Sequence, residues 1–337
     1  MNNSHIGIIV PFVSWNTYVK ECVDGCRELD YDNWHLILVP DSPISLPEPL
    51  QEDKRISIVV SGDVTIARKR NLALNTFQNN DYYACIDSDA YPEKSWLKNA
   101  VTTFAMHENV WAVGGPNICP KNEAIKEKAV GNSLKSFLVS GTRAFRKKIS
   151  SSRFCVDLPT CNLIISKETI ESLKGFNENL ITGEDIEFCN RIVQRNKKIY
   201  YANNVIVYHH NRPLWKPFFL QRITYGLSVF KVFRENKSLF NIFLFLPLLF
   251  LLFIVSAPFI FIYSTEIRKV TASIILGYFC IVGIETLRYT EKRSEIPLTF
   301  LALLMGNISP GIGSLLALLH IKVDIKKIYK NFNQETK

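Results

Sequence analysis

The stretch "YYACIDSDAYPEKSW", Tyr82 to Trp96, begins as an apolar run and presents two carboxylates just where that run ends. The apolar run is typical of a buried β-strand. Residues i and i+2 of a strand lie on the same face, so we expect Asp87 and Asp89 to point the same way, with Ser88 turned aside. Two like charges so placed repel each other unless a positive group lies between them. The end of this strand is therefore a candidate site for a charged ligand.

Similar apolar runs lie on both sides of this strand and alternate with helical patterns. We expect further strands at residues 5–12, 34–42, 55–60, 110–116, 160–166 and 198–210. Helices are expected at residues 18–29, 65–77, 94–106, 167–176 and 184–196. This alternation favours an α/β fold with a doubly wound, mostly parallel sheet, in which ligands bind at the carboxyl ends of the strands.

The composition changes in the C-terminal part of the chain. Leu, Ile, Phe and Val dominate from Asn241 to Ile321. Three hydrophobic segments are expected in the membrane, at residues 239–264, 270–287 and 296–321. The third contains several Gly and Pro residues, so it either crosses the membrane or enters it and returns. We therefore expect a cytosolic domain at 1–235, a transmembrane region at 236–321 and a basic tail at 322–337.

The formal net charge is +9, and the positive side chains are scattered or flank the apolar segments. No nucleic-acid-binding motif accompanies them, so the charge indicates an anionic membrane or a phosphorylated substrate, with no nucleic acid as partner. The start "MNNSHIGIIVPF" lacks the basic region of a signal peptide. The positive-inside rule favours two crossings with a re-entrant or interfacial third segment. We expect a multi-pass protein of the cytoplasmic membrane whose soluble domain lies in the cytosol.

The chain has eight cysteines, and no two of them form a C-x-x-C pair. Several stand in apolar surroundings, as reduced core cysteines do. The spacing therefore gives no reason to expect a zinc site.

Asp87 and Asp89 offer hard oxygen ligands at a strand end, which suits Mg²⁺ or Mn²⁺ bridging a diphosphate. We expect the positive partner of these acids to be such a cation and not a side chain. Asp41 ends the second strand and could accept a hydrogen bond from a base, while Lys69 and Arg70 could contact phosphates. Alternatively, Asp87 and Asp89 belong to an ordinary Asp-rich turn, Asp41 begins a turn, and Lys69 and Arg70 lie on a solvated helix face.

Two further pairs are candidates. Thr182 to Asp185 resembles a helix capping box, and a carboxylate of Glu184 or Asp185 could also serve as a general base. His209 and His210 follow a strand, so only one of them can point towards the acids. We assign His210 as a candidate third metal ligand, with a strand-edge histidine as the alternative.

Several motifs occur in a fixed order between residues 5 and 235: "IGIIVPF", "LVPDS", "ARKRNLAL", "CIDSDAYPEKSWL", "CNLIIS", "GEDIEFCNRIV" and "VYHHNRPLWKP". Together they resemble the family 2 glycosyltransferases with the GT-A fold. The chain looks most like the membrane-anchored members that build envelope polysaccharides and glycolipids. The resemblance implies a metal-dependent, inverting transfer of a sugar from a UDP- or GDP-linked donor to a lipid-linked or saccharide acceptor.

The resemblance also implies roles for individual residues. Asp89 matches a direct metal ligand, and Asp87 a contact to ribose or metal. Pro11 and Asp41 match positions that line the nucleotide pocket, and Lys69 and Arg70 lie in the nucleotide-contacting helix. Asp185 matches the catalytic base, which Glu184 would support.

The sequence departs from the family pattern at three places, one of which is "LKGFNENL", where Lys174 and Asn177 stand at positions that often hold Gly and an acid. Pro40 replaces the first acid of the pair that usually follows the second strand, and Thr224 and Tyr225 stand at the Arg and Trp positions of the processive Q-x-x-R-W motif. We therefore expect transfer of single sugars. The alternatives are a processive polysaccharide synthase, a non-catalytic nucleotide-binding membrane scaffold, and a phosphatase that uses D-x-D after a strand.

Overall fold

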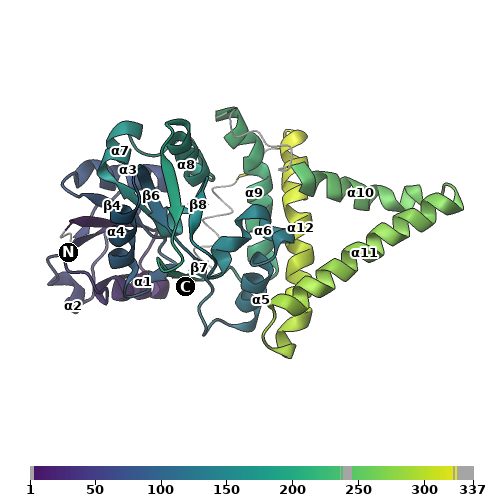
Figure 1. Ribbon diagram of the computed structural model, residues 1–337, viewed down its shortest axis with the longest axis horizontal. Coiled ribbons are helices and arrows are strands. Elements are labelled where there is room, and N and C mark those ends of the chain that lie inside the picture. The colour runs from purple at the N-terminus through teal and green to yellow at the C-terminus, as the bar shows by residue number, and fades with distance from the viewer. Residues whose placement is uncertain (1–3, 236, 238–244, 322, 325–337) are drawn as a thin grey trace. The chain divides into compact units, whose positions relative to one another are not determined.

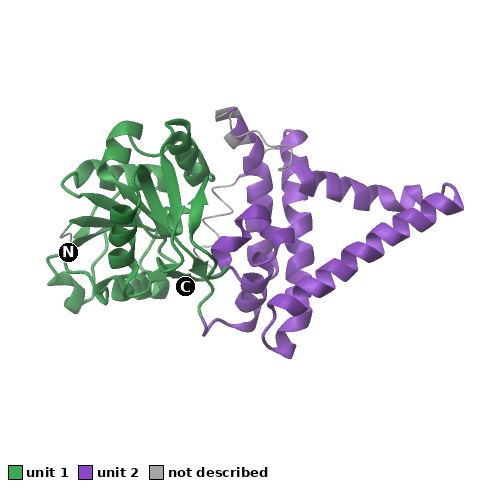
Figure 2. Ribbon diagram, in the orientation of Figure 1, with its two compact units in different colours: residues 1–120, 148–210, 329–337 green, residues 121–147, 211–328 purple. Residues whose placement is uncertain are grey.

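The computed structural model describes residues 4–235, 237, 245–321 and 323–324. The chain divides into two compact units, which are described separately (Figure 2). Among the described residues, unit 1 holds 4–120 and 148–210, and unit 2 holds 121–147 and those from 211 to 324. Residues 121–147 and 211–235, expected in the first domain, thus contribute to the unit of the C-terminal helices. The expected basic tail lies almost entirely outside the described residues.

Unit 1 is built on an eight-stranded sheet (Figure 1). Its order is β3 (Ile56–Ile58), β2 (Trp34–Val39), β1 (Ile6–Pro11), β4 (Tyr82–Cys85), β9 (Leu163–Ser166), β6 (Val110–Gly114), β10 (Lys198–Tyr201) and β8 (Arg153–Cys155). The first four strands are parallel, as are β6 and β10. β9 runs antiparallel to both β4 and β6, and β8 is antiparallel to β10. The expected mostly parallel sheet is confirmed, with antiparallel β9 in its middle.

Helices pack against this sheet: α1 (Thr17–Arg27), α2 (Glu48–Gln51), α3 (Ile66–Thr76), α4 (Trp96–Met106), α7 (Lys167–Leu173) and α8 (Glu184–Gln194). All six residues of β1 are buried, as expected of a strand covered on both faces. Ile8 packs in one core cluster with apolar residues of α1 and α4. The carboxyl ends of β1 and β4 are thereby held rigidly, and the candidate residues follow these ends.

A second, three-stranded sheet has the order β5 (Ala90–Pro92), β11 (Val207–His209) and β7 (Asn117–Ile118). The single strand expected over 198–210 is therefore wrong: β10 and β11 belong to different sheets. The chain turns between them, where the carbonyl oxygens of Ala202 and Val205 approach Gly115 more closely than any side chain would allow. This turn sends β11 to the segment that follows the two acids.

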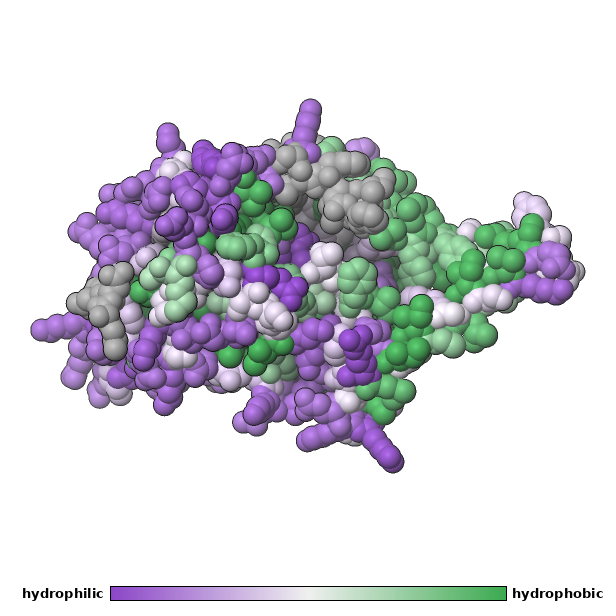
Figure 3. All heavy atoms as spheres, viewed as in Figure 1, coloured by the Kyte–Doolittle hydropathy of each residue, from purple (hydrophilic) through white to green (hydrophobic). Residues whose placement is uncertain are grey.

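Unit 2 is helical. It contains α5 (Ile125–Leu134), α6 (Phe137–Ser140), α9 (Lys216–Glu235), α10 (Leu246–Ile260), α11 (Thr265–Tyr289), α12 (Ile296–Leu318) and the 3₁₀ turns Gly141–Lys147 and Arg293–Glu295. Two helical stretches, Thr265–Tyr289 and Arg293–Leu318, are long and apolar enough to cross a membrane. α10 is shorter, and residues 239–244 of the expected first segment lie outside the described residues. Hydrophobic side chains gather on the surface of α10 and α11 (Figure 3).

The third hydrophobic segment forms one continuous helix, α12, which runs through Pro310. The Gly and Pro residues of this segment therefore do not break the helix. Its small residues serve close packing instead: a Cβ on Gly313 would meet the carbonyl oxygen of Ile223 on α9 at 2.1 Å, and one on Gly311 would meet that of Pro247 on α10 at 2.3 Å. Small residues of this kind let helix backbones approach in membrane proteins.

Gly226→Ala is expected to destabilise unit 2 by about 1–3 kcal/mol, the usual cost of overpacking. A Cβ on Gly226 would meet the carbonyl oxygen of Pro310 at 2.0 Å, so α9 and α12 must separate. Thermal unfolding in detergent measures the loss. Gly277→Ala on α11 is the matched control, because a Cβ there has no atom within 4 Å in the described structure. Equal melting temperatures for the two variants would contradict the close packing.

Candidate active site

The two acids follow β4 in a turn. The strand ends at Cys85, Ser88 and Asp89 form the turn, and β5 begins at Ala90, whose N–H donates to the carbonyl oxygen of Asp87 at 3.1 Å. The expectation that Asp87 and Asp89 share a face of a strand is therefore wrong, because the strand stops before them. The turn instead directs the two carboxylates to different partners.

Asp87 is neutralised in part by a buried arginine. Arg70, on α3, is 1% exposed. Its guanidinium donates to Oδ1 of Asp87 at 2.8 Å and to Oε1 of Glu184, also at 2.8 Å. The expectation that a cation and not a side chain provides the positive partner is thus wrong for Asp87. Arg70 ties the turn after β4 to the first residue of α8.

The start of α8 separates the roles of Glu184 and Asp185. The helix is preceded by Gly183 in the left-handed region (φ 82°), with no side-chain cap. The expected capping box is therefore wrong, because glycine occupies the cap position and allows this positive φ. Glu184 is buried and bonded to Arg70, whereas Asp185 is half-buried. Of the two acids, Asp185 is the one left accessible to a ligand.

Burial raises the pKa of Glu184 to about 7, with a further contribution from Asp185, against the lowering effect of Arg70. A raised carboxyl pKa means that the folded state keeps a proton that the unfolded state releases above its ordinary pKa of 4.5. The associated stability is present below pH 4.5 and is lost as the pH rises through about 7.

Glu184→Gln is therefore expected to flatten the pH dependence of stability. From pH 5 to pH 8 the melting temperature of the wild type should fall relative to that of the variant. The difference corresponds to about 3 kcal/mol at most, since one pKa unit is worth about 1.4 kcal/mol. Thermal unfolding of both proteins across this range measures it, and parallel curves would show that Glu184 titrates normally.

Pro11, Asp41 and Lys69 gather at the carboxyl ends of β1 and β2. Pro11 is the last residue of β1, and the next residue, Phe12, has a carbonyl oxygen that accepts a hydrogen bond from Nζ of Lys69. Lys69 is buried and forms an ion pair with Asp41. Burial lowers the pKa of the Lys69 amine, and Asp41 opposes this shift. Lys69 and Arg70 are thus both engaged with acids of the chain itself.

The two histidines point to different places. Nε2 of His209 lies 3.2 Å from Oδ1 of Asp89, whereas Nε2 of His210 lies 2.6 Å from a carboxylate oxygen of Glu21. The pairing of β11 with β5 sets His209 opposite Ala90. The structure therefore favours His209 over His210 as the histidine next to the acids, and sequence alternation could not tell which of the two faces them.

The residues present fit a divalent cation. Ligand atoms of Asp87, Cys161 and His209 lie within 4.8 Å of one another. Nδ1 of His209 is buried and has no hydrogen-bond partner among the described residues. Carboxylate and imidazole donors suit Mn²⁺, and carboxylates also suit Mg²⁺. Cys161 was not expected here, because nothing in its sequence spacing marks it as a ligand.

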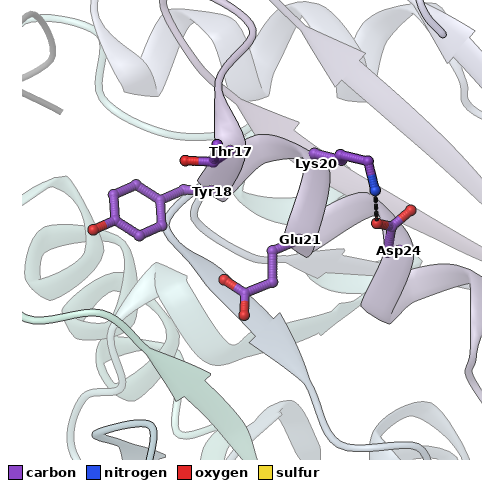
Figure 4. A pocket seen from close by; sticks show the side chains of 5 residues that line it. All are labelled: Thr17, Tyr18, Lys20, Glu21 and Asp24. Atoms are coloured by element: carbon purple, nitrogen blue, oxygen red, sulfur yellow. Dashed lines mark hydrogen bonds and ion pairs between the residues drawn. The ribbon is translucent and has the colours of Figure 1, made fainter. Parts of the chain in front are cut away.

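A separate hollow lies on the outer face of α1 (Figure 4). It is lined by Thr17, Tyr18, Lys20, Glu21 and Asp24, and Lys20 forms an ion pair with Asp24 at 2.5 Å. It contains none of the expected site residues. One of its lining residues, Glu21, is the partner of His210.

Residues 7–170 match the family model described as glycosyl transferase family 2. This part of the chain belongs to glycosyltransferase family 2. The match includes all but the first residue of β1, α3 and the turn that holds Asp87 and Asp89, and it ends before α8.

This glycosyltransferase is 24% identical over 304 residues to the dolichyl N-acetyl-α-D-glucosaminyl phosphate 3-β-D-2,3-diacetamido-2,3-dideoxy-β-D-glucuronosyltransferase of Methanococcus voltae. The match covers 86% of this chain and 89% of that protein. A pre-mycofactocin glycosyltransferase of Mycobacterium tuberculosis is 26% identical over 162 residues, which cover 48% of this chain and 33% of that protein.

Among solved structures, a mannosyltransferase from Pyrobaculum calidifontis in complex with GDP-Man and Mn²⁺ has a similar fold. The TM-score is 0.59 at 14% identity, over 95% of this chain and 88% of that one. The expected GT-A fold is confirmed.

Proposed function

We propose that this glycosyltransferase moves a sugar from a nucleotide-diphospho-sugar to a lipid-linked or cell-envelope saccharide acceptor, with inversion at the anomeric carbon. One observation carries the proposal: Arg70 bonds both Asp87 and Glu184, so half-buried Asp185 is held next to the turn that contains the two acids. A base and a cation-binding turn fixed to each other are what a displacement at a sugar diphosphate requires.

On the donor side, we assign Pro11 and Asp41 to the nucleotide pocket at the ends of β1 and β2. Lys69 and Arg70 act as positioning residues, because their charged groups are buried against acids of the chain. Asp87, Asp89 and His209 would hold Mg²⁺ or Mn²⁺. When bound, this cation neutralises charge on the departing diphosphate.

On the acceptor side, Asp185 accepts the proton of the attacking hydroxyl. Glu184, held by Arg70, fixes the first turn of α8 so that the carboxylate of Asp185 keeps its orientation. A single direct displacement by that hydroxyl inverts the anomeric carbon. No second accessible acid is needed in this scheme.

A membrane-bound acceptor accounts for the helical unit. Two of its helical stretches are long and apolar enough to span a membrane. The Methanococcus voltae relative, matched over 89% of its length, is named for a dolichyl-phosphate-linked sugar acceptor. We therefore place the protein in the cytoplasmic membrane, with residues 1–235 in the cytosol and a role in making envelope polysaccharides or glycolipids.

The test uses the full chain in detergent with Mn²⁺ or Mg²⁺, a panel of UDP- and GDP-sugars, and a polyprenyl-phosphate-linked sugar as acceptor. We expect one donor to give a single-sugar product whose anomeric configuration, read by NMR, is inverted. A ladder of products would favour a processive synthase. Nucleotide binding without transfer or hydrolysis would favour a non-catalytic scaffold and overturn the proposal.

A further inference from the structure

We propose that the thiol of Cys161 is a ligand of the metal site, so that this chain binds softer divalent cations such as Co²⁺, Zn²⁺ and Cd²⁺ through sulfur, nitrogen and oxygen. The inference deepens the proposed metal site and rests on it for its catalytic meaning. The carboxylates of a D-x-D turn alone would favour hard cations such as Mg²⁺. A thiolate beside them changes which cation the site prefers.

The adjacent ends of β4 and β9 bring Cys161 close to Asp87. β4 and β9 are antiparallel, and Cys85 at the end of β4 pairs with Leu163 at the start of β9. Asp87 follows the end of β4 by two residues, and Cys161 lies two residues before the start of β9, in the 3₁₀ turn Thr160–Asn162. The paired strand ends thus set where both segments start, and the ligand atoms of Asp87 and Cys161 lie within 4.8 Å of each other.

Close backbone packing fixes the segment that carries Cys161. A Cβ on Gly114 would meet the carbonyl oxygen of Asn162 at 2.1 Å, so β6 lies against this segment. The side chain of Asn162 is fully buried and donates to the carbonyl oxygens of Pro116 and Val205, at 3.0 and 2.8 Å. The backbone that carries Cys161 is therefore fixed beside Asp87 and His209.

Two orphaned polar atoms at this place point to a ligand. Asn117 is 3% exposed; its Nδ2 donates to Sγ of Cys161 at 3.0 Å, and its Oδ1 has no hydrogen-bond partner in the described ranges of the chain. Nδ1 of His209 is likewise buried without such a partner there. Buried polar atoms are rarely left unpaired in native structures, so the presence of these two together indicates a group that normally binds there.

Asn117 also suits a sulfur ligand. An N–H donor at a sulfur favours its negatively charged form, and metals bind cysteine as the thiolate. As the metal–sulfur bond forms, the S–H proton passes to the buffer, and no oxidant or reductant is needed. The site then has one sulfur, one nitrogen and one oxygen donor from Cys161, His209 and Asp87.

The test is metal binding by the full chain in detergent, with Co²⁺, Cd²⁺ and Mn²⁺ as separate probes. Co²⁺ should give a sulfur-to-cobalt charge-transfer band in the near ultraviolet with wild-type protein and with Cys26→Ala, a matched change at a fully buried cysteine of α1. Cys161→Ser should abolish the band. It should also weaken Co²⁺ and Cd²⁺ binding by at least the roughly 10- to 100-fold seen when a metal ligand loses a supporting partner.

Mn²⁺ binding, followed by electron paramagnetic resonance, reports whether Cys161→Ser still folds. If that variant does not fold, cadmium NMR of the wild type replaces it, because a sulfur ligand shifts the cadmium resonance strongly downfield. A wild-type cobalt spectrum without the charge-transfer band, or a band that survives in Cys161→Ser, would overturn the inference. If the wild type transfers sugar but shows no charge-transfer band, the proposed function stands and the Cys161 inference fails. If the wild type shows the band but transfers no sugar, the Cys161 inference stands and the proposed function fails.

Discussion

Asp185→Asn is expected to lower kcat for sugar transfer by about 10²- to 10⁴-fold, the usual contribution of a general base. Asparagine keeps the shape of the side chain but cannot accept the proton of the attacking hydroxyl. Binding of the nucleotide sugar should change little, because Asp87 and Asp41 are untouched. The measurement is steady-state transfer with the donor identified in the panel, together with donor affinity by titration calorimetry.

The matched control is Glu168→Gln, which removes a carboxylate from the first turn of α7. It tests whether the loss reflects a helix-terminus charge, worth about 0.3–1 kcal/mol, instead of catalysis. We expect Glu168→Gln to transfer sugar at the wild-type rate. If Asp185→Asn retained more than a tenth of the activity, or lost donor binding in parallel with activity, Asp185 would not be the base.

Arg70→Met should destabilise the protein by about 3–5 kcal/mol at pH 8 and by less at pH 6, because Glu184 is charged only above its pKa of about 7 and then loses its partner. Glu184 bears most of this cost: its side chain is 11% exposed, whereas that of Asp87 is 33% exposed and partly solvated. Denaturant unfolding or the melting temperature in detergent measures the loss. Sugar transfer should fall as well, since Asp87 is no longer held.

Two controls sharpen this experiment. Arg68→Met, on the same helix, removes an arginine whose side chain is 64% exposed and whose Nε lies 3.8 Å from Oε2 of Glu178. Its loss should lower the free energy of unfolding by at most about 1 kcal/mol. The double variant Arg70→Met with Glu184→Leu removes both partners of this buried pair and should recover much of the stability without recovering activity. Additive losses in the double variant would contradict direct coupling of Arg70 to Glu184.

The alternating strands and helices were predictable from sequence because each depends on apolar periodicity within a short stretch. The acids after β4 and the Glu-Asp pair that begins α8 could also be selected as candidate site residues, because each belongs to a short local motif. The antiparallel direction of β9 was not predictable, since a buried strand reads the same in either direction. The split of 198–210 into two strands was also hidden, because it depends on the packing of the turn against Gly115, far away in sequence.

The sequence by itself determined the fold class and the types of residue available for chemistry, since both are written in local patterns. Only the tertiary structure decided which of them come together: Arg70 with Asp87, His209 and not His210 with Asp89, and Cys161 with Asp87. Each of these contacts depends on how segments distant along the chain pair or pack in the folded protein. Such long-range pairing is a property of the folded core, and no single stretch of sequence contains it.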